Sequence, residues 1–199
     1  MRTLNRLSAR FIVLENDNVD TDQIIPARFL TSTSRLGLGE GLFADWRYDA
    51  EGAPYPDFVL NRPEAQGAEV LVVGRNFGCG SSREHAAWAL LENGFRVVIS
   101  TEIADIFRAN ALKNGMLPVL VPEAVHARLV EMGVGVIEIC VEEQSVRLED
   151  GFEVSFPIDP FARDCLINGV DELGFLLRQV DAIARYEQVG AAPGARAST

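Results

Sequence analysis

Short apolar runs alternate with helical patterns through the middle of the chain. Three continuous apolar runs are typical of strands buried on both faces of a parallel sheet, at residues 69–74, 97–99 and 118–121. A helical pattern follows each of them, at residues 82–93, 104–114 and 122–132. Gly94 and Gly115 stand where the first two helices are expected to end. This alternation predicts a parallel sheet with right-handed crossover connections.

The pattern differs on both sides of this region. Residues 9–14 predict one further strand before it, and short strands are predicted after it at residues 136–141, 145–148 and 152–156. Asp150 and Gly151 fit a two-residue hairpin turn between the last two strands, which makes that pair antiparallel. Two helical patterns follow, at residues 160–167 and 172–186. We therefore expect an α/β fold with a central, mostly parallel sheet and a second, small antiparallel sheet.

A single domain is expected to span residues 1–189, because the chain shows no internal repeat and no long linker. Within it, residues 31–66 have no regular period and are predicted to form a long loop, a feature that is often functional in compact domains. Residues 190–199 consist mainly of Ala, Gly, Pro and Ser, so we expect a disordered tail there.

The charge balance excludes several classes of function. The net charge is −11, and a protein that binds nucleic acid through its phosphates needs a basic face. No apolar run approaches the roughly 20 residues that span a bilayer, and no secretory signal follows Met1. We expect no nucleic acid, no membrane and a cytoplasmic location. A small anionic substrate remains compatible, because a few arginines can dominate one pocket.

Cysteine and aspartate patterns bear on metal binding. The three cysteines, Cys79, Cys140 and Cys165, are odd in number and widely spaced, which argues against a disulfide framework. They include no closely spaced pair, so this chain alone is not expected to hold an iron–sulfur cluster or a structural zinc ion. Asp20 and Asp22 could ligate a hard metal ion, but two carboxylates in a turn more often stabilise the turn.

The segment from Gly74 to His85 links a predicted strand to the start of a helix, a geometry that presents free backbone N–H groups to anions. It matches neither the dinucleotide nor the nucleotide glycine pattern. Ser81 stands three residues before Glu84 and fits a capping box. An N-cap hydroxyl lies at the positive end of the helix, which also favours its deprotonated form, so Ser81 is both a candidate cap and a candidate base. Arg83 in the first turn opposes the helix dipole, which hints at a nearby anion.

The run from Asn76 to Ala86 resembles the signature of the aconitase swivel-domain family, and in particular that of isopropylmalate isomerase small subunits. Further motifs of this family are similar along nearly the whole chain, at residues 17–26, 42–47, 56–61, 104–107, 114–118, 158–161, 168–169 and 181–187. The fold that this resemblance implies is a three-layer β/β/α swivel domain.

The implied activity is reversible dehydration. In this family 2-isopropylmalate loses water to give an alkene diacid, which regains water as 3-isopropylmalate during leucine biosynthesis. The chemistry needs a base, a Lewis acid for the departing hydroxide, and cationic donors for the carboxylates of the hydroxy-diacid. The resemblance implies that the Lewis acid is a [4Fe-4S] cluster on a separate large subunit, without which this chain is inactive. The small number of cysteines in this chain agrees with a cluster on the other subunit.

The resemblance also implies roles for single residues. Ser81 would be the catalytic base, and Ser82 and Arg83 would bind substrate carboxylates. Asp22, Cys79 and Gly80 would organise the site around them. The loop after the Thr-Asp-x-Ile motif is linked to substrate choice in this family, which adds these candidate binding residues: Arg28, Thr31, Ser32 and Arg35.

Two alternatives remain at the sequence level. Related enzymes act on citraconate, homoaconitate or methylated malates, and the polar run Thr31-Ser32-Thr33 is not obviously suited to an isopropyl group. The chain could also be a non-catalytic nucleotide-binding or RNA-binding module. The net charge of −11 and the missing phosphate-loop lysine both argue against this alternative.

Overall fold

The structure, a computed structural model, describes residues 1–30 and 36–190. Among these residues, seven strands form one sheet in the order β4-β3-β2-β1-β5-β6-β7. The strands are β1 (Arg6–Leu14), β2 (Val70–Val73), β3 (Val97–Ser100), β4 (Leu117–Leu120), β5 (Val134–Cys140), β6 (Ser145–Leu148) and β7 (Glu153–Ser155). The α-helices are α1 (Thr21–Ile24), α2 (Ala44–Arg47), α3 (Glu84–Glu92), α4 (Asp105–Asn114), α5 (Glu123–Met132), α6 (Pro160–Asn168), α7 (Glu172–Arg178) and α8 (Val180–Gly190). Short 3-10 helices are η1 (Ala27–Phe29), η2 (Leu38–Gly41), η3 (Val59–Asn61) and η4 (Pro63–Ala65).

Strand β1 stands at the centre of the sheet and joins its two parts. It pairs in parallel with β2, where Phe11 faces Val70, and antiparallel with β5, where the same residue faces Gly135. The α/β class with parallel and antiparallel parts is thus confirmed. The two parts form one continuous curled sheet, because β5 satisfies the backbone groups along the edge of β1 that would otherwise stay open.

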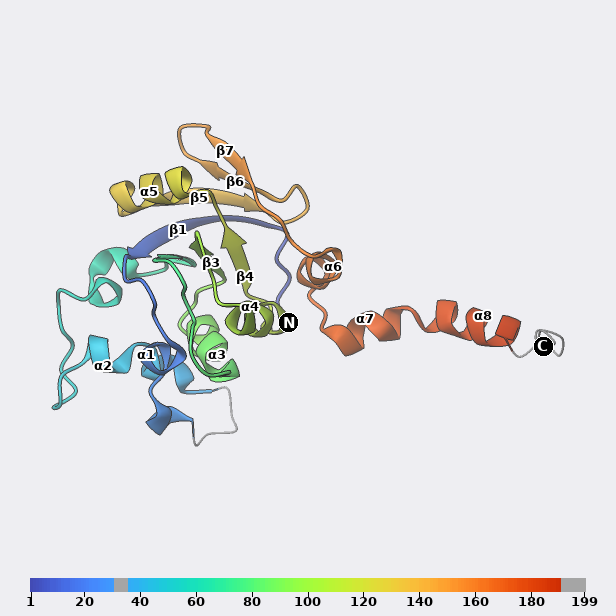
Figure 1. The fold of residues 1–199 in the computed structure, drawn as a ribbon, viewed down its shortest axis with the longest axis horizontal. Helices are drawn as coiled ribbons and strands as arrows, with labels where there is room; N and C mark the ends of the chain where they lie inside the picture. Colours follow the sequence, from blue (N-terminus) through green and yellow to red (C-terminus); the bar gives the residue numbers. More distant parts are fainter. Residues whose placement is uncertain (31–35, 191–199) are drawn as a thin grey trace.

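Alternate residues of the strands face two separate cores. Phe11 and Val13 of β1 point into the space between the parallel strands and the antiparallel strands that curl over them, where α5 and α6 also pack. Ile12 and Leu14 point to the opposite face, which α3, α4 and the long connection cover (Figure 1). The expected β/β/α layers follow from this arrangement.

Several local expectations need correction. The hairpin between β6 and β7 has a three-residue loop, because Leu148 pairs with Phe152 and Gly151 (φ +86°) takes the left-handed position. The helix expected at 172–186 is divided at Gln179 into α7 and α8. The predicted tail at 190–199 lies outside the described residues apart from Gly190, which ends α8. No helix in the described part of the chain is long and apolar enough to cross a bilayer.

The described part of the connection between η1 and β2, residues 36–69, contains short helical turns anchored by aromatic side chains. Phe43 is fully buried and stacks on Trp46 with ring centroids 5.6 Å apart, while Phe58 packs on both rings. The carboxylate of Glu92, at the end of α3, accepts hydrogen bonds of 2.6 Å from the backbone N–H groups of Gly37 and Gly39. These contacts attach the connection to α3, the helix that follows the Gly-rich turn (residues 74–83).

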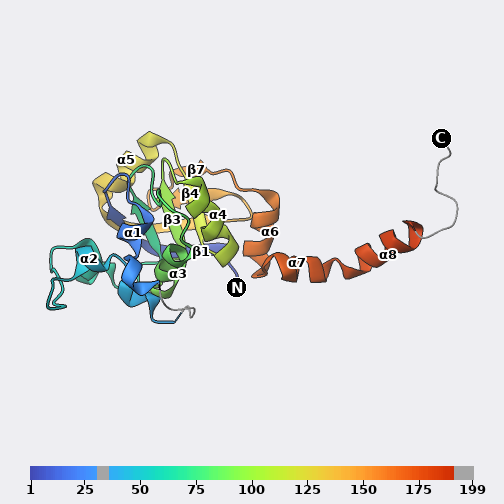
Figure 2. The ribbon, with the colours of Figure 1, turned by 60° about the horizontal axis from the view of Figure 1, so that its bottom comes forward.

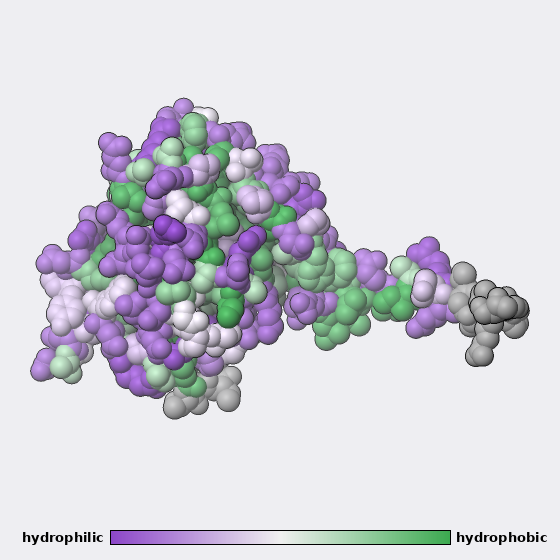
Figure 3. Space-filling view, in the orientation of Figure 1, coloured by the Kyte–Doolittle hydropathy of each residue, from purple (hydrophilic) through white to green (hydrophobic). Residues whose placement is uncertain are grey.

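The C-terminal helices α7 and α8 extend away from the body of the protein (Figures 1 and 2). Apolar side chains gather along them in the space-filling view (Figure 3). The exposed ones are Leu173, Leu176, Leu177, Val180, Ile183 and Tyr186.

Candidate active site

Two polar segments lie side by side where β1 and β2 end. The backbone N–H of Gly78 donates to the carbonyl of Val19 at 2.7 Å, and that of Thr21 donates to the carbonyl of Cys79 at 3.0 Å. Because neighbouring parallel strands end at the same edge of the sheet, the turn after β1 and the Gly-rich turn after β2 must meet there. The carboxyl edge of an open α/β sheet is the usual place for a ligand.

Left-handed backbone at alternate residues shapes the Gly-rich turn. Asn76, Gly78 and Gly80 have φ values of +56°, +76° and +88°. A side chain at Gly78 would place its Cβ 2.4 Å from the ring of Phe107, which leaves no room for any other residue type. Gly80 meets no such obstacle, so its requirement for glycine is conformational rather than steric.

Buried groups fix the start of the turn. The hydroxyl of Ser100, at the end of β3, is completely buried and donates to the carbonyl of Gly74 at 2.8 Å. Phe77 packs edge to face on Phe107 of α4, with ring centroids 5.3 Å apart. The backbone of Phe77 also bonds that of Glu102 and Ala104. The base of the turn is therefore held by buried contacts with β3 and α4.

The tip of the turn carries the serines that the sequence singled out. Ser81 and Ser82 are both exposed. Within the described residues, no acceptor meets the backbone N–H groups of Gly80, Ser81, Ser82 and Arg83. Unpaired N–H groups next to the start of α3 attract negative charge, so the tip can receive a carboxylate.

The predicted capping box of Ser81 and Glu84 is wrong. Helix α3 begins at Glu84 with Arg83 as its N-cap, and no side chain of the described residues caps it. The carboxylate of Glu84 accepts instead from Asn114 at 2.8 Å and from Lys113 at 3.3 Å, both at the end of α4. These tertiary partners replace the local bond on which the prediction relied, so Ser81 lies before the helix rather than at its cap.

A capping box does occur at α1. The side chain of Asp20 accepts from the N–H of Gln23 at 2.8 Å, and the amide oxygen of Gln23 accepts from the N–H of Asp20 at 2.8 Å. The two residues are three positions apart, a signature that sequence reasoning could have used. Asp20 therefore stabilises a helix start, and within the described residues no group of three His, Cys, Asp or Glu side chains could hold a metal ion.

Arg83 reaches across to α1. Its Nη1 donates to the carboxylate of Asp22, and its side chain is only 19% exposed against 53% for Asp22. This ion pair fixes the direction of the guanidinium next to Ser81 and Ser82. A guanidinium has five N–H donors, so binding to Asp22 leaves others for a substrate carboxylate.

The structure does not bring all the predicted binding residues together. Arg28 pairs with Asp45 of α2 at 2.6 Å and lies over the ring of Phe29. Among the described residues, no hydrogen bond or ion pair connects Arg28 to the Gly-rich turn. The other three candidates lie outside the described residues: Thr31, Ser32 and Arg35.

The cysteines do not meet. Cys79 is half-buried in the turn, where its Sγ donates to the carbonyl of Asn18 at 3.4 Å, whereas Cys140 and Cys165 are buried elsewhere. Burial, with help from nearby acidic residues such as Asp164, raises the pKa of the Cys165 thiol. The cysteines of this chain therefore do not fit an iron–sulfur cluster.

Thiol alkylation should distinguish these environments. Under native conditions at neutral pH we expect iodoacetamide to modify Cys79 first, because it alone of the three side chains is not buried. Peptide mass mapping over time would measure the order. Unfolded protein, in which all three thiols are accessible, is the control. Modification of Cys140 or Cys165 before Cys79 would contradict the described burial.

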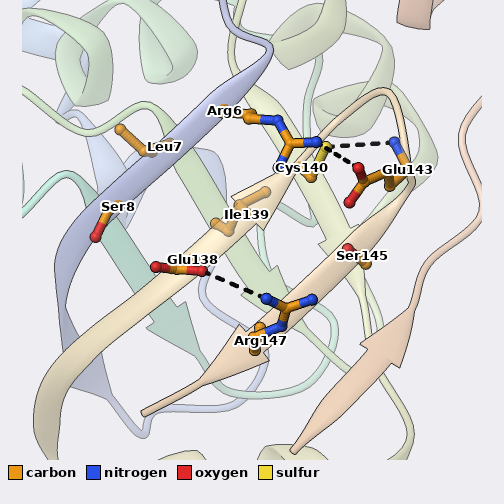
Figure 4. Close-up of a pocket in the computed structure, with 9 residues that line it drawn as sticks. All are labelled: Arg6, Leu7, Ser8, Glu138, Ile139, Cys140, Glu143, Ser145 and Arg147. Carbon is orange, nitrogen blue, oxygen red and sulfur yellow. Dashed lines mark hydrogen bonds and ion pairs between the residues drawn. The ribbon is translucent and has the colours of Figure 1, made fainter. Parts of the chain in front are cut away.

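A separate hollow lies on the outer face of β1, β5 and β6 (Figure 4). Its charged groups pair with one another: Arg6 with Glu143, and Arg147 with Glu138. It contains none of the predicted site residues. We interpret it as a solvated surface of cross-strand ion pairs.

Comparison with known proteins identifies the family of the chain. The aconitase C-terminal domain family matches residues 1–124. The 3-isopropylmalate dehydratase small subunit of Anaeromyxobacter dehalogenans is 60% identical over 187 residues, which are 94% of this chain and 98% of that protein. The chain belongs to the same family as this small subunit. A small subunit of the same name from a Roseiflexus species is 54% identical over 191 residues, covering 94% of each chain. The family indicated by the motifs is thereby confirmed.

One solved structure shows a similar fold. A 3-isopropylmalate dehydratase from Methanocaldococcus jannaschii superposes with a TM-score of 0.65, at 24% identity, over 91% of this chain and 99% of that one. At this identity the likeness concerns the fold alone, and it extends beyond the parallel strands to most of the described chain.

Proposed function

We propose that the chain is the small subunit of a heteromeric hydro-lyase that interconverts 2-isopropylmalate and 3-isopropylmalate by dehydration and rehydration, in leucine biosynthesis. The 60% identity to a small subunit of that name over nearly its full length carries the proposal. The exposed serines and unpaired N–H groups of the Gly-rich turn support it, because a diacid substrate needs anion-binding groups. A cytoplasmic location and the lack of a nucleic-acid partner stay predictions.

In the proposed mechanism the tip of the turn supplies both the base and part of the binding site. Ser81 removes the proton from the carbon next to a substrate carboxylate, and returns it in the reverse direction. Ser82, Arg83 and the free N–H groups bind the carboxylates and the negative charge that develops beside them. Asp22 keeps the guanidinium of Arg83 in place, and Gly80 allows the backbone conformation of the tip.

The metal centre is assigned to the partner. The separate cysteines of this chain do not fit a cluster, and within the described residues no other donor group could replace them. As the family resemblance implies, we assign to a large subunit a [4Fe-4S] cluster, which would supply the Lewis acid for the departing hydroxide. The active site would be complete only when the two subunits meet.

Reconstitution tests the proposal. The isolated chain should show no dehydratase activity, and the mixture with its anaerobically prepared large subunit should convert 2-isopropylmalate to 3-isopropylmalate. Absorbance of the alkene diacid intermediate measures the reaction. The large subunit alone is the control. Full activity of the large subunit without this chain would refute the assignment of the base to Ser81.

The same assay tests the second candidate, a hydro-lyase for another diacid. The polar residues Thr31, Ser32 and Thr33 in the loop linked to substrate choice favour it. Citraconate, homoaconitate and methylated malates should each be offered to the reconstituted enzyme. A kcat/KM for one of them well above that for isopropylmalate would replace the substrate but keep the reaction class.

A further inference from the structure

Among the described residues, the side chain of Thr21 makes the one buried polar contact with the tip of the Gly-rich turn, residues 79–82. Thr21 is 3% exposed, and its hydroxyl donates to the carbonyl oxygen of Ser81 at 2.8 Å. Its backbone N–H donates to the carbonyl oxygen of Cys79 at 3.0 Å. Within the described residues, no other side chain bonds the backbone of residues 79–82. One residue of α1 therefore fixes two of the four carbonyls of residues 79–82.

This bond sets the direction of a peptide plane. In a trans peptide the carbonyl of Ser81 and the N–H of Ser82 point in opposite directions. Because the carbonyl points at the hydroxyl of Thr21, the N–H of Ser82 points away from α1, and it meets no acceptor in the described part of the chain. The same plane ends at the Cα of Ser81, so a displacement of this peptide that shifts the Cα would also shift the Ser81 side chain.

Little else restrains the tip. A Cβ at Gly80 would meet nothing nearer than 3.4 Å, and both serines are exposed. The next restraint along the chain is the ion pair between Arg83 and Asp22. Asp22 immediately follows Thr21 in α1. Neighbouring residues of α1 thus hold positions 79, 81 and 83, while the side chains of Ser81 and Ser82 stay available for a ligand.

We propose that Thr21 is a positioning residue for the reaction, which orients Ser81 and the N–H of Ser82 through its buried hydroxyl without touching the substrate. This inference rests on the proposed function. A buried hydroxyl with a purely structural role would contribute to stability alone, whereas a positioning role predicts an effect on kcat that exceeds the effect on assembly and folding.

Thr21→Val tests this inference, because valine keeps the shape of threonine and removes the hydroxyl. A methyl group cannot approach the carbonyl of Ser81 to 2.8 Å, so the peptide must move. In the reconstituted two-subunit enzyme we expect kcat to fall about 10- to 100-fold with a smaller change in KM. Thr21→Ser retains the hydroxyl and should recover most of kcat.

Ser100→Ala is the matched structural control. It removes another buried hydroxyl that bonds the same turn, at Gly74, remote from its tip. It should lower the thermal unfolding midpoint as Thr21→Val does, with far less effect on kcat. All variants are compared for unfolding and for affinity toward the large subunit.

Three results would overturn the positioning role. They are wild-type kcat in Thr21→Val, equal loss in Thr21→Ser and Thr21→Val, or a loss explained entirely by weaker subunit binding. Ser81→Ala, assayed in parallel, distinguishes a failure of the positioning role from a failure of the proposed function. If Ser81→Ala is inactive while Thr21→Val is normal, only the positioning role fails. If Ser81→Ala is fully active, the assignment of the base itself fails.

Discussion

Ser81→Ala should nearly abolish turnover of the reconstituted enzyme while leaving the fold and subunit assembly intact. Loss of a general base typically lowers kcat by about 10²- to 10⁴-fold. The side chain is exposed, and within the described residues it makes no hydrogen bond, so its removal should change the free energy of unfolding by less than about 0.5 kcal/mol. Steady-state kinetics with 2-isopropylmalate and thermal unfolding would measure the two effects.

Ser82→Ala is the matched control for this variant. Ser82 is the exposed neighbour on the same tip, and its proposed role is to bind a substrate carboxylate. We expect its loss to raise KM more than it lowers kcat, the opposite of the effect at Ser81. Normal turnover in Ser81→Ala, with assembly unchanged, would exclude a serine base at this position.

Gly78→Ala should destabilise the protein more than the same substitution at Gly80 of the same turn. The new Cβ would lie 2.4 Å from Cγ and 2.5 Å from Cβ of Phe107, a residue that is 1% exposed and cannot move aside. Overpacking costs about 1–3 kcal/mol. The left-handed backbone (φ +76°) costs a non-glycine residue roughly 1–2 kcal/mol more. Urea unfolding of the isolated chain would measure the sum as a shift of the midpoint.

Gly80→Ala separates the two contributions. Gly80 also has a left-handed backbone (φ +88°), but its added Cβ would meet nothing closer than 3.4 Å. We expect it to lose only the conformational part, roughly 1–2 kcal/mol. Equal destabilisation by the two variants would show that contact with Phe107 is unimportant.

Much of the fold could be predicted because its signals are local. The apolar runs predicted β2, β3 and β4 to within one or two residues, since strands buried on both faces contain few polar side chains. Gly94 and Gly115 follow α3 and α4 with φ values of +107° and +87°, as helix ends require. The same local reasoning failed where a distant group competed for a side chain, as Asn114 does for Glu84.

The candidate site could be predicted only in part. The resemblance in the Gly-rich segment singled out Ser81, Ser82 and Arg83, and the structure places them together on one exposed tip beside Asp22. The resemblance could not indicate that Asp45 pairs with Arg28, because that contact depends on how the connection between η1 and β2 packs. The role of Thr21 was also missed, since a threonine beside two aspartates looks like any polar turn until its partner 60 residues away is known.

By itself, the sequence determined which segments are strands and helices, where glycine must reverse the chain, and which family the chain resembles. These features depend on residues close together along the chain. Only the tertiary structure decided that β1 joins the parallel and antiparallel strands, that α1 lies against the Gly-rich turn, and that helix α3 starts at Glu84 rather than directly after Ser81. The reason is that hydrogen bonds between distant segments depend on which strands become neighbours, and a buried partner outcompetes a local one.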